Sequence, residues 1–230
     1  MSDKKFTSDE LEDFYKGSYV EKLGKQPVSR LRRLLPYFEL KDSDIVADFG
    51  CGDGLLLSLI YSRVRRYVGI DFSEDFIAAA NKRYSQAQIH NATFQRADII
   101  AFCSQNNNTF DKAFTMDFSE HIYDDMFLSV YSAIFNSLKD NGKLYLHTPN
   151  GNYLLEILKN RGVLKQFPQH VAVRNAEENT LLLRQAGFSH VAVHFLPHYV
   201  RPLSYLHFLS YIPLIGRYFQ ARLLIVCSKT

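Results

Sequence analysis

Residues 46–54 read VADFGCGDG, and residues 67–76 read YVGIDFSEDF. Three glycines, Gly50, Gly52 and Gly54, alternate directly after an apolar run, and Asp71 ends a second apolar run. In an open α/β sheet a ligand binds beyond the carboxyl ends of the strands, where a strand turns into the next helix. Glycine lets the backbone approach a ligand closely and adopt positive φ. The two stretches therefore predict a ligand-binding turn.

Three neighbouring residues narrow the choice of ligand. Asp71 follows the glycines by about twenty residues, a spacing from which a carboxylate accepts hydrogen bonds from both hydroxyls of a ribose. The dinucleotide pattern G-x-G-x-x-G needs glycine at position 55, where the chain has Leu55, and this weakens NAD and FAD as ligands. Asp48 precedes the first glycine, and a carboxylate attracts cations and repels phosphates. S-adenosylmethionine (SAM), which carries an ammonium and a sulfonium, fits this pattern.

Apolar, β-branched runs alternate with helical periodicity along the rest of the chain. A helix is predicted over 122–138, with Ile122, Met126, Val130, Ile134 and Leu138 as one apolar stripe. The alternation predicts a Rossmann-like, doubly wound α/β fold with a mixed seven-stranded sheet. The last strand is expected to be antiparallel, because no ordinary crossover pattern separates it from the strand before. The predicted strands are IVADFG (45–50), RYVGID (66–71), ATFQRAD (92–98), DKAFTMD (111–117), KLYLHTP (143–149), HVAVHFL (190–196) and RLLIVCS (222–228).

Composition is that of an ordinary globular protein. The chain has 230 residues, 47% of them hydrophobic, and a net charge of +3, too mild to indicate a nucleic-acid partner by itself. Cys51, Cys103 and Cys227 are odd in number and far apart, which argues against a disulfide framework or a zinc site. The N-terminus is too polar for a secretory signal. We therefore expect a cytoplasmic protein with a single domain over residues 1–230.

Together these motifs resemble the class I SAM-dependent methyltransferases over roughly residues 35–195. Besides the two opening stretches, QRADI (95–99), FDKAFTMDFSEHI (110–122) and LKDNGKLYLHTPN (138–150) match segments of that family. The resemblance implies that the glycine turn holds the methionine and ribose parts of SAM, that Phe72 covers one adenine face, and that Asp98 with Ile99 meets the adenine edge. The implied cofactor-binding residues are Asp48, Gly50, Cys51, Gly52, Gly54, Asp71, Phe72, Asp98, Ile99, Asp117, Tyr15 and Tyr19.

Catalytic candidates follow the fourth predicted strand, where Asp117, Glu120 and His121 form D-x-x-E-H. This resembles E-x-x-E-H in the ubiquinone-biosynthesis O-methyltransferases and the small-RNA 2'-O-methyltransferases, where acids and histidine can hold a divalent metal. The three residues are thus candidate ligands for Mg²⁺ or Mn²⁺. The alternative is that the acid and histidine only provide favourable charge and capping where a helix begins. His147 and His170 join His121 as candidate catalytic residues.

Two further segments are expected to elaborate the domain. A helical cap over about 1–40 would place Tyr15 and Tyr19 against SAM, whose sulfonium favours aromatic faces. Residues 197–219, PHYVRPLSYLHFLSYIPLIGRYF, are predicted to form an apolar helical insertion. This insertion could be a lid over an apolar substrate, a dimer surface, or a peripheral membrane contact.

The leading functional hypothesis is O-methylation of a small hydroxylated acceptor that is aromatic, lipid-like or a sugar. Methyl transfer from a sulfonium is an in-line displacement, so positioning carries much of the rate, and a base is needed only for a protonated acceptor. The D-x-x-E-H motif and local basic clusters keep RNA 2'-O-methylation open as an alternative. A non-catalytic module that binds SAM and regulates a partner is the third hypothesis.

Overall fold

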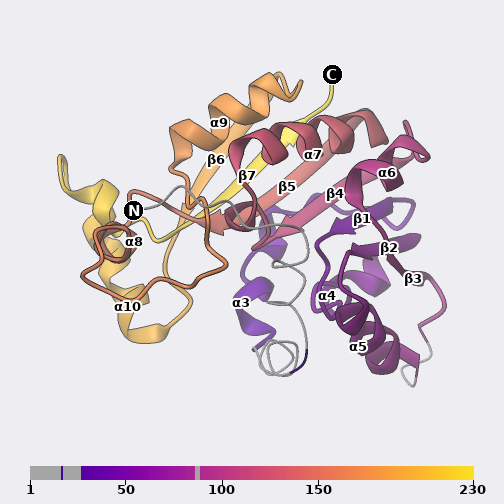
Figure 1. Ribbon diagram of the computed structural model, residues 1–230, viewed down its shortest axis with the longest axis horizontal. Coiled ribbons are helices and arrows are strands. Elements are labelled where there is room, and N and C mark those ends of the chain that lie inside the picture. The colour runs from indigo at the N-terminus through magenta and orange to yellow at the C-terminus, as the bar shows by residue number, and fades with distance from the viewer. Residues whose placement is uncertain (1–16, 18–26, 86–88) are drawn as a thin grey trace. The chain divides into compact units, whose positions relative to one another are not determined.

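The computed structural model describes residue 17 and residues 27–85 and 89–230 (Figure 1). Tyr15 and Tyr19, and most of the expected cap over 1–40, lie outside these residues. The strands are β1 (Ile45–Phe49), β2 (Arg66–Asp71), β3 (Ala92–Arg96), β4 (Phe110–Met116), β5 (Leu138–Pro149), β6 (His190–Leu196) and β7 (Arg222–Ser228). The α-helices are α3 (Ser29–Arg32), α4 (Leu57–Ile60), α5 (Glu74–Ser85), α6 (Ile99–Ser104), α7 (Asp124–Ser137), α8 (Leu154–Asn160), α9 (Ala176–Gln185) and α10 (Arg201–Tyr205).

The strands form a mixed seven-stranded sheet in the order β3-β2-β1-β4-β5-β7-β6. The pairs β1 with β2, β2 with β3, and β4 with β5 are parallel. Strand β7 runs antiparallel to both β5 and β6. The predicted Rossmann-like fold with an antiparallel last strand is therefore confirmed. By its internal contacts the chain divides into two compact units, Met1–Ile99 and Ile100–Thr230.

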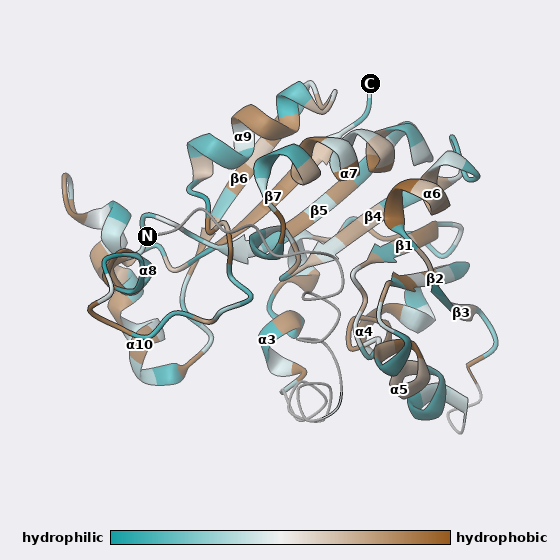
Figure 2. Ribbon diagram, in the orientation of Figure 1, coloured by the Kyte–Doolittle hydropathy of each residue, from teal (hydrophilic) through white to brown (hydrophobic). Residues whose placement is uncertain are grey.

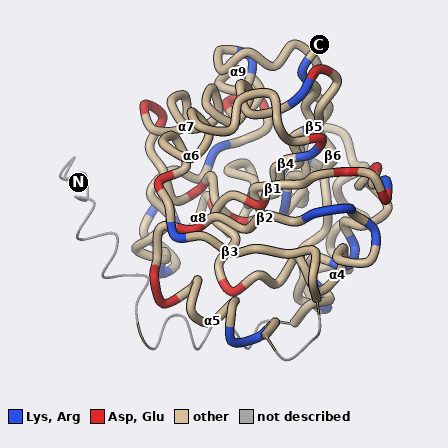
Figure 3. The backbone as a smooth tube through the Cα atoms, turned by 90° about the vertical axis from the view of Figure 1, so that its right-hand side faces the viewer, with Lys and Arg blue, Asp and Glu red and all other residues tan. Residues whose placement is uncertain are grey.

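Unit 1 contains β1 to β3 and α3 to α5. Strand β1 is apolar because it is covered on both faces, and Val46, Ala47 and Phe49 are fully buried. Helix α5 follows β2, with acidic residues in its first turn and basic residues in its last turn (Figure 3). This charge order favours the helix dipole. Unit 1 therefore presents a glycine turn at the end of β1 and a carboxylate at the end of β2.

Unit 2 contains β4 to β7, with α7 and α9 packed beside each other over the strands (Figure 1). Figure 2 shows hydrophobic residues along these strands and a mixture of hydrophilic and hydrophobic residues on both helices. The predicted stripe was wrong at Met126, which is 47% exposed, and at its two ends, Ile122 and Leu138, which lie outside α7. The buried face runs through Phe127, Val130, Tyr131 and Ile134 instead. Spacings of three and four residues follow the 3.6-residue turn more closely than a constant step of four.

Strand β5 begins five residues earlier than predicted, at Leu138 instead of Lys143. Leu138 pairs with Phe110, and a register shift between Phe110 and Lys112 absorbs the intervening residues. Such a bulge adds residues to one strand without ending the pairing. Residues 139–142, KDNG, are polar and typical of a turn, so the sequence did not predict that β5 extends through them.

Residues 197–219, the predicted apolar helical insertion, form several short helical pieces. Helix α10 is followed by 3-10 turns at Leu206–Tyr211 and Gly216–Phe219. Pro202 sits in the first turn of α10, where proline is tolerated, and Pro213 separates the two 3-10 turns. Within the described part of the chain, no helix combines the length and apolarity needed to cross a bilayer.

Candidate functional site

The glycine turn of unit 1 follows β1 directly. Gly50, Gly52 and Gly54 have φ values of 69°, 54° and 75°, in the left-handed region that favours glycine. The backbone N–H groups of Gly50 and Cys51 both donate to the carbonyl oxygen of Ile70 in β2, at 2.8 and 3.1 Å. The turn is thereby fastened to the strand that ends in Asp71.

The third glycine has a packing role. A Cβ on Gly54 would lie 2.7 Å from the Phe94 ring and 2.9 Å from the Tyr84 ring. The Tyr84 hydroxyl donates to the Gly54 carbonyl oxygen at 2.6 Å. The close approach that Gly54 permits is thus to side chains of its own unit, and its place among the cofactor-binding residues stays a prediction.

Asp48 is a buried acid at the carboxyl end of β1, only 2% exposed. The Tyr67 hydroxyl donates to its Oδ2 at 2.5 Å, whereas its buried Oδ1 has no hydrogen-bond partner among the described residues. Burial raises the pKa of Asp48 from 3.8 to about 7, the Tyr67 hydrogen bond lowers it, and the Asp71 charge raises it further. A buried carboxylate of this kind is stabilised by a cation.

Asp71 is held by the backbone on both of its oxygens. Gly52 N–H donates to Oδ2 and Ser73 N–H donates to Oδ1, each at 2.9 Å. Burial raises the pKa of Asp71 to about 6, against the lowering effect of these backbone donors. Each carboxylate oxygen has more than one acceptor direction, so a fixed Asp71 can still accept from hydroxyl groups of a ligand.

The remaining candidates of unit 1 lie in different surroundings. Phe72 is 40% exposed directly after β2, so its ring is not part of the core. Cys51 is buried in the glycine turn, and burial raises the pKa of its thiol. Asp98 is exposed and stands directly before α6, whose first residue, Ile99, is buried.

In unit 2, Asp117 follows β4 and is bound to β5 and β7. Its Oδ1 accepts from an Nη2 group of Arg222 and lies 2.9 Å from Nδ1 of His147, which is 2% exposed. Asp117 has a φ of 56°, a conformation that Asp tolerates better than most residues. The carboxylate is therefore part of an acid, histidine and arginine cluster.

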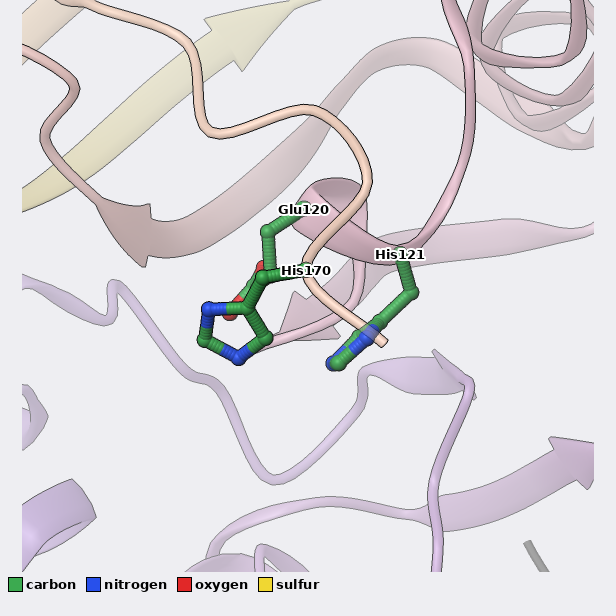
Figure 4. Close-up of side chains that lie close together, drawn as sticks. All are labelled: Glu120, His121 and His170. Carbon is green, nitrogen blue, oxygen red and sulfur yellow. The ribbon is translucent and has the colours of Figure 1, made fainter. Parts of the chain in front are cut away.

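Glu120, His121 and His170 form a second cluster (Figure 4). Among the described residues, one carboxylate oxygen and one nitrogen from each ring lie within 4.8 Å of one another. The structure thus groups Glu120 and His121 with His170, while Asp117, the other predicted metal ligand, is bound to Arg222 and His147. His170 was not predicted as a metal ligand, because it lies fifty residues after Glu120 in the sequence and no local motif joins the two.

Hydrogen bonds from outside the cluster hold Glu120 and His121 in place. Glu120 is 1% exposed, and Thr148 donates to its Oε2 at 3.1 Å. Nδ1 of His121 lies 2.9 Å from the carbonyl oxygen of Gln169, which can only accept, so Nδ1 carries the proton and Nε2 the lone pair. A backbone carbonyl that orients an imidazole in this way is common around metal sites.

Burial keeps both imidazoles neutral at pH 7. The pKa of His121 falls from 6.5 to about 4, against a small opposing effect of the Gln169 carbonyl. Burial, with the nearby His121 and Lys159, lowers the pKa of His170 to about 3. Weak bases with available lone pairs are better suited to binding a metal than to removing a proton.

Arg174 holds the loop that carries this cluster, and sequence reasoning missed it. Its guanidinium donates to the carbonyl oxygens of Ser119 and Ile122, at 2.8 and 2.7 Å, and to Asp124 Oδ1 at 2.8 Å. It is 5% exposed and stacks over the Phe127 ring at 4.7 Å. A single arginine after an apolar stretch carries little local signal, whereas its partners are fifty residues away.

A family of methyltransferase domains matches residues 40–196. The chain belongs to this family. The resemblance to class I SAM-dependent methyltransferases is thereby confirmed.

Individual methyltransferases match only parts of this chain. A ubiquinone biosynthesis O-methyltransferase of Acinetobacter baumannii is 26% identical over 127 residues, which cover 54% of this chain and 53% of the relative. An uncharacterized methyltransferase of Schizosaccharomyces pombe is 45% identical over 65 residues, which cover 28% of this chain and 22% of that protein. The chain thus spans about half the length, or less, of these curated relatives.

Solved structures of methyltransferases share the fold. A SAM dependent methyltransferase from Archaeoglobus fulgidus has a TM-score of 0.67 at 20% identity, over 95% of this chain and 98% of the other. Phosphoethanolamine N-methyltransferase 2 of Haemonchus contortus, in complex with SAM, has a TM-score of 0.70 at 18% identity, over 95% and 60%. The seven-stranded fold of this chain is thus that of known methyltransferases.

Proposed function

We propose that the protein transfers the methyl group of SAM to a hydroxyl oxygen of a small acceptor that is aromatic, lipid-like or a sugar. The observation that carries this proposal is the cluster of Glu120, His121 and His170 in a methyltransferase domain. A hydroxyl keeps its proton at neutral pH, so its methylation needs a group that binds the oxygen and makes the proton easier to lose. The A. baumannii relative, named for O-methylation, supports the same acceptor chemistry.

The cofactor site fits SAM in its charge. When bound, SAM supplies an electrophilic methyl group on a sulfonium. Asp48 offers a buried carboxylate with an unpartnered oxygen among the described residues, which suits a cationic ligand. Asp71 would accept from the ribose hydroxyls, and the exposed ring of Phe72 would cover the adenine.

The donor set of unit 2 fits a divalent cation. Glu120 would supply an oxygen, and His121 and His170 would each supply a neutral nitrogen. His170 Nδ1 is buried with no hydrogen-bond partner among the described residues. Two imidazoles with one carboxylate favour Mn²⁺ over Mg²⁺, since Mg²⁺ prefers oxygen ligands. A bound cation would lower the pKa of a coordinated hydroxyl.

His147 is the proposed base for the remaining proton. Asp117 lies at its Nδ1, which favours the tautomer with Nδ1 protonated and the lone pair on Nε2. The pairing of carboxylate and imidazole also holds the ring in place, as it does in hydrolase triads. We further propose that residues 1–230 act as one methyltransferase domain in the cytoplasm.

Methyl transfer from tritium-labelled SAM into cell extract would test the proposed reaction. The extract is then separated into RNA, lipid, protein and small molecules. We expect label in the lipid or small-molecule fraction, in products that resist the mild alkali that cleaves esters. Label in RNA would replace the proposal with 2'-O-methylation. SAM binding without any transfer would indicate a non-catalytic module.

Metal binding is tested by thermal unfolding of EDTA-treated protein with and without Mn²⁺. A ligand specific for the folded state adds about 2.7 kcal/mol at roughly a hundredfold excess over its Kd. We expect Mn²⁺ to raise the Tm of the wild type but not that of Glu120→Gln or His170→Gln. Glu177→Gln, an exposed acid in the first turn of α9, is the matched control and should respond like the wild type. Equal shifts in all four proteins would exclude this site.

A further inference from the structure

Residues 199–215 carry exposed apolar side chains that the proposed reaction does not use. Leu214 is 92% exposed, Tyr211 83%, Tyr205 73% and Phe208 65%. Val200, Leu206, Ile212 and Ile215 are also exposed. The yellow segment at the left of Figure 1 is this part of the chain, and its projecting tip is coloured as hydrophobic in Figure 2. A contiguous apolar surface of this kind marks a contact with a membrane or another macromolecule.

Residues 212–216, within this segment, form a hydrogen-bonded turn. Gly216 N–H donates to the Ile212 carbonyl oxygen at 2.8 Å, and Ile215 N–H donates to the Pro213 carbonyl oxygen at 2.9 Å. Leu214 has a φ of 71°, which is strained for leucine. A Cβ on Gly216 would meet the Ser210 carbonyl oxygen at 2.2 Å, so only glycine fits under the turn. The backbone thus holds Leu214 outward at a conformational cost.

The charged residues of the C-terminal part of the chain have one sign. Glu178 is the last acidic residue, and residues 179–230 contain no Asp or Glu. Arg201 and Arg217 flank the apolar run and are both exposed. Apolar and tyrosine side chains bordered by arginines match the acyl boundary and anionic headgroups of a bilayer. A surface that binds RNA carries a stripe of clustered basic residues, and two arginines do not form such a stripe.

We infer that residues 199–217 dock the protein on an anionic lipid surface, with Leu214 and Tyr211 inserted and Arg201 and Arg217 at the headgroups. The segment lies on the bilayer, consistent with short helices that are too small to cross it. The inference goes beyond the proposed function and does not rest on it.

Co-sedimentation of the full chain with vesicles tests this inference. The vesicles contain phosphatidylcholine with or without phosphatidylglycerol. We expect binding to the anionic vesicles and little to phosphatidylcholine alone. Tyr211→Ser with Leu214→Asn should weaken binding roughly tenfold or more, because two inserted side chains are lost. Asn tolerates the left-handed φ of position 214, so the turn should keep its shape.

The matched control is Met126→Ser with Leu181→Ser, which removes two exposed apolar side chains from α7 and α9. It should bind like the wild type. Arg201→Gln with Arg217→Gln should weaken binding about fivefold for each arginine and reduce its salt dependence. SAM affinity should be unchanged and Tm should not fall in any variant, which would show that the variants are folded.

Three results would overturn the inference. The first is wild-type protein that stays in the supernatant with anionic vesicles. The second is binding that the Tyr211 and Leu214 substitutions do not change. The third is a wild-type dimer in sedimentation velocity that these substitutions convert to a monomer, because the surface would then be covered by a second copy of the chain.

Discussion

The glycine turn of unit 1 and the histidine cluster of unit 2 both bury ionisable groups, but with opposite consequences for charge. Burial raises the pKa of Asp48 to about 7 and of Asp71 to about 6, so the acids resist becoming negative. Burial lowers the pKa of His121 to about 4 and of His170 to about 3, so the imidazoles resist becoming positive.

The two regions are therefore suited to different ligands. Burial makes the charged form of a carboxylate unfavourable, and a cation bound beside it offsets this desolvation cost. Neutral imidazoles beside one carboxylate instead offer lone pairs to a metal ion. The first arrangement suits the positive charges of SAM, and the second suits a divalent cation that binds a hydroxyl.

The stability of the two regions should depend on pH with opposite signs, and this is the largest expected effect. The folded pKa of Asp48 lies above the unfolded value of 3.8, so its contribution to stability is present below pH 3.8 and lost as pH rises through about 7. The folded pKa values of His121 and His170 lie below 6.5, so their contribution is present above pH 6.5 and lost as pH falls towards about 4 and about 3.

Two variants separate these opposing effects. Chemical denaturation of metal-free protein gives the free energy of unfolding at each pH. Asp48→Asn should abolish a loss of unfolding free energy on the order of 4 kcal/mol between low and neutral pH, because the pKa shift from 3.8 to about 7 is worth about 1.4 kcal/mol for each unit. His170→Gln should leave a protein whose stability falls less in acid. Parallel pH profiles for both variants and the wild type would contradict the assigned charge states.

Asp71→Ala should produce the next largest effect, on SAM affinity. Hydrogen bonds to a charged group contribute about 1.5 to 3 kcal/mol, so we expect a loss of roughly tenfold to a hundredfold in affinity. Asp71→Asn keeps one acceptor oxygen and should lose less. Asp140→Ala, an exposed acid in β5, is the control and should bind SAM like the wild type. Calorimetry that finds normal affinity in folded Asp71→Ala would exclude Asp71 as a cofactor ligand.

The sequence was most informative where structure is local. The seven strands were predicted because apolar β-branched runs have a short period, and β2, β6 and β7 have the predicted bounds. The glycine turn and Asp71 were found because they are joined by one short crossover. The early start of β5 was missed because a bulge at Phe110 and Lys112 depends on the partner strand.

Residues brought together over long distances were harder to foresee. The link from Asp117 to Arg222 spans 105 residues, and that from Arg174 to Ser119 spans 55. No periodicity reports such pairs. The grouping of His170 with Glu120, in place of Asp117, also follows from the path of the loop that Arg174 holds.

The central claim is that the buried acids of the glycine turn bind a cationic cofactor. Calorimetric titration of SAM at about pH 6.5, in two buffers of different ionisation enthalpy, measures the protons exchanged on binding. At that pH Asp48, with a pKa of about 7, is partly protonated, and a bound cation lowers its pKa. We predict a net release of a fraction of a proton at this pH, and a smaller release in Asp48→Asn, where only Asp71 remains to lose one. SAM that fails to bind, or binds with no release or with proton uptake, would contradict the claim.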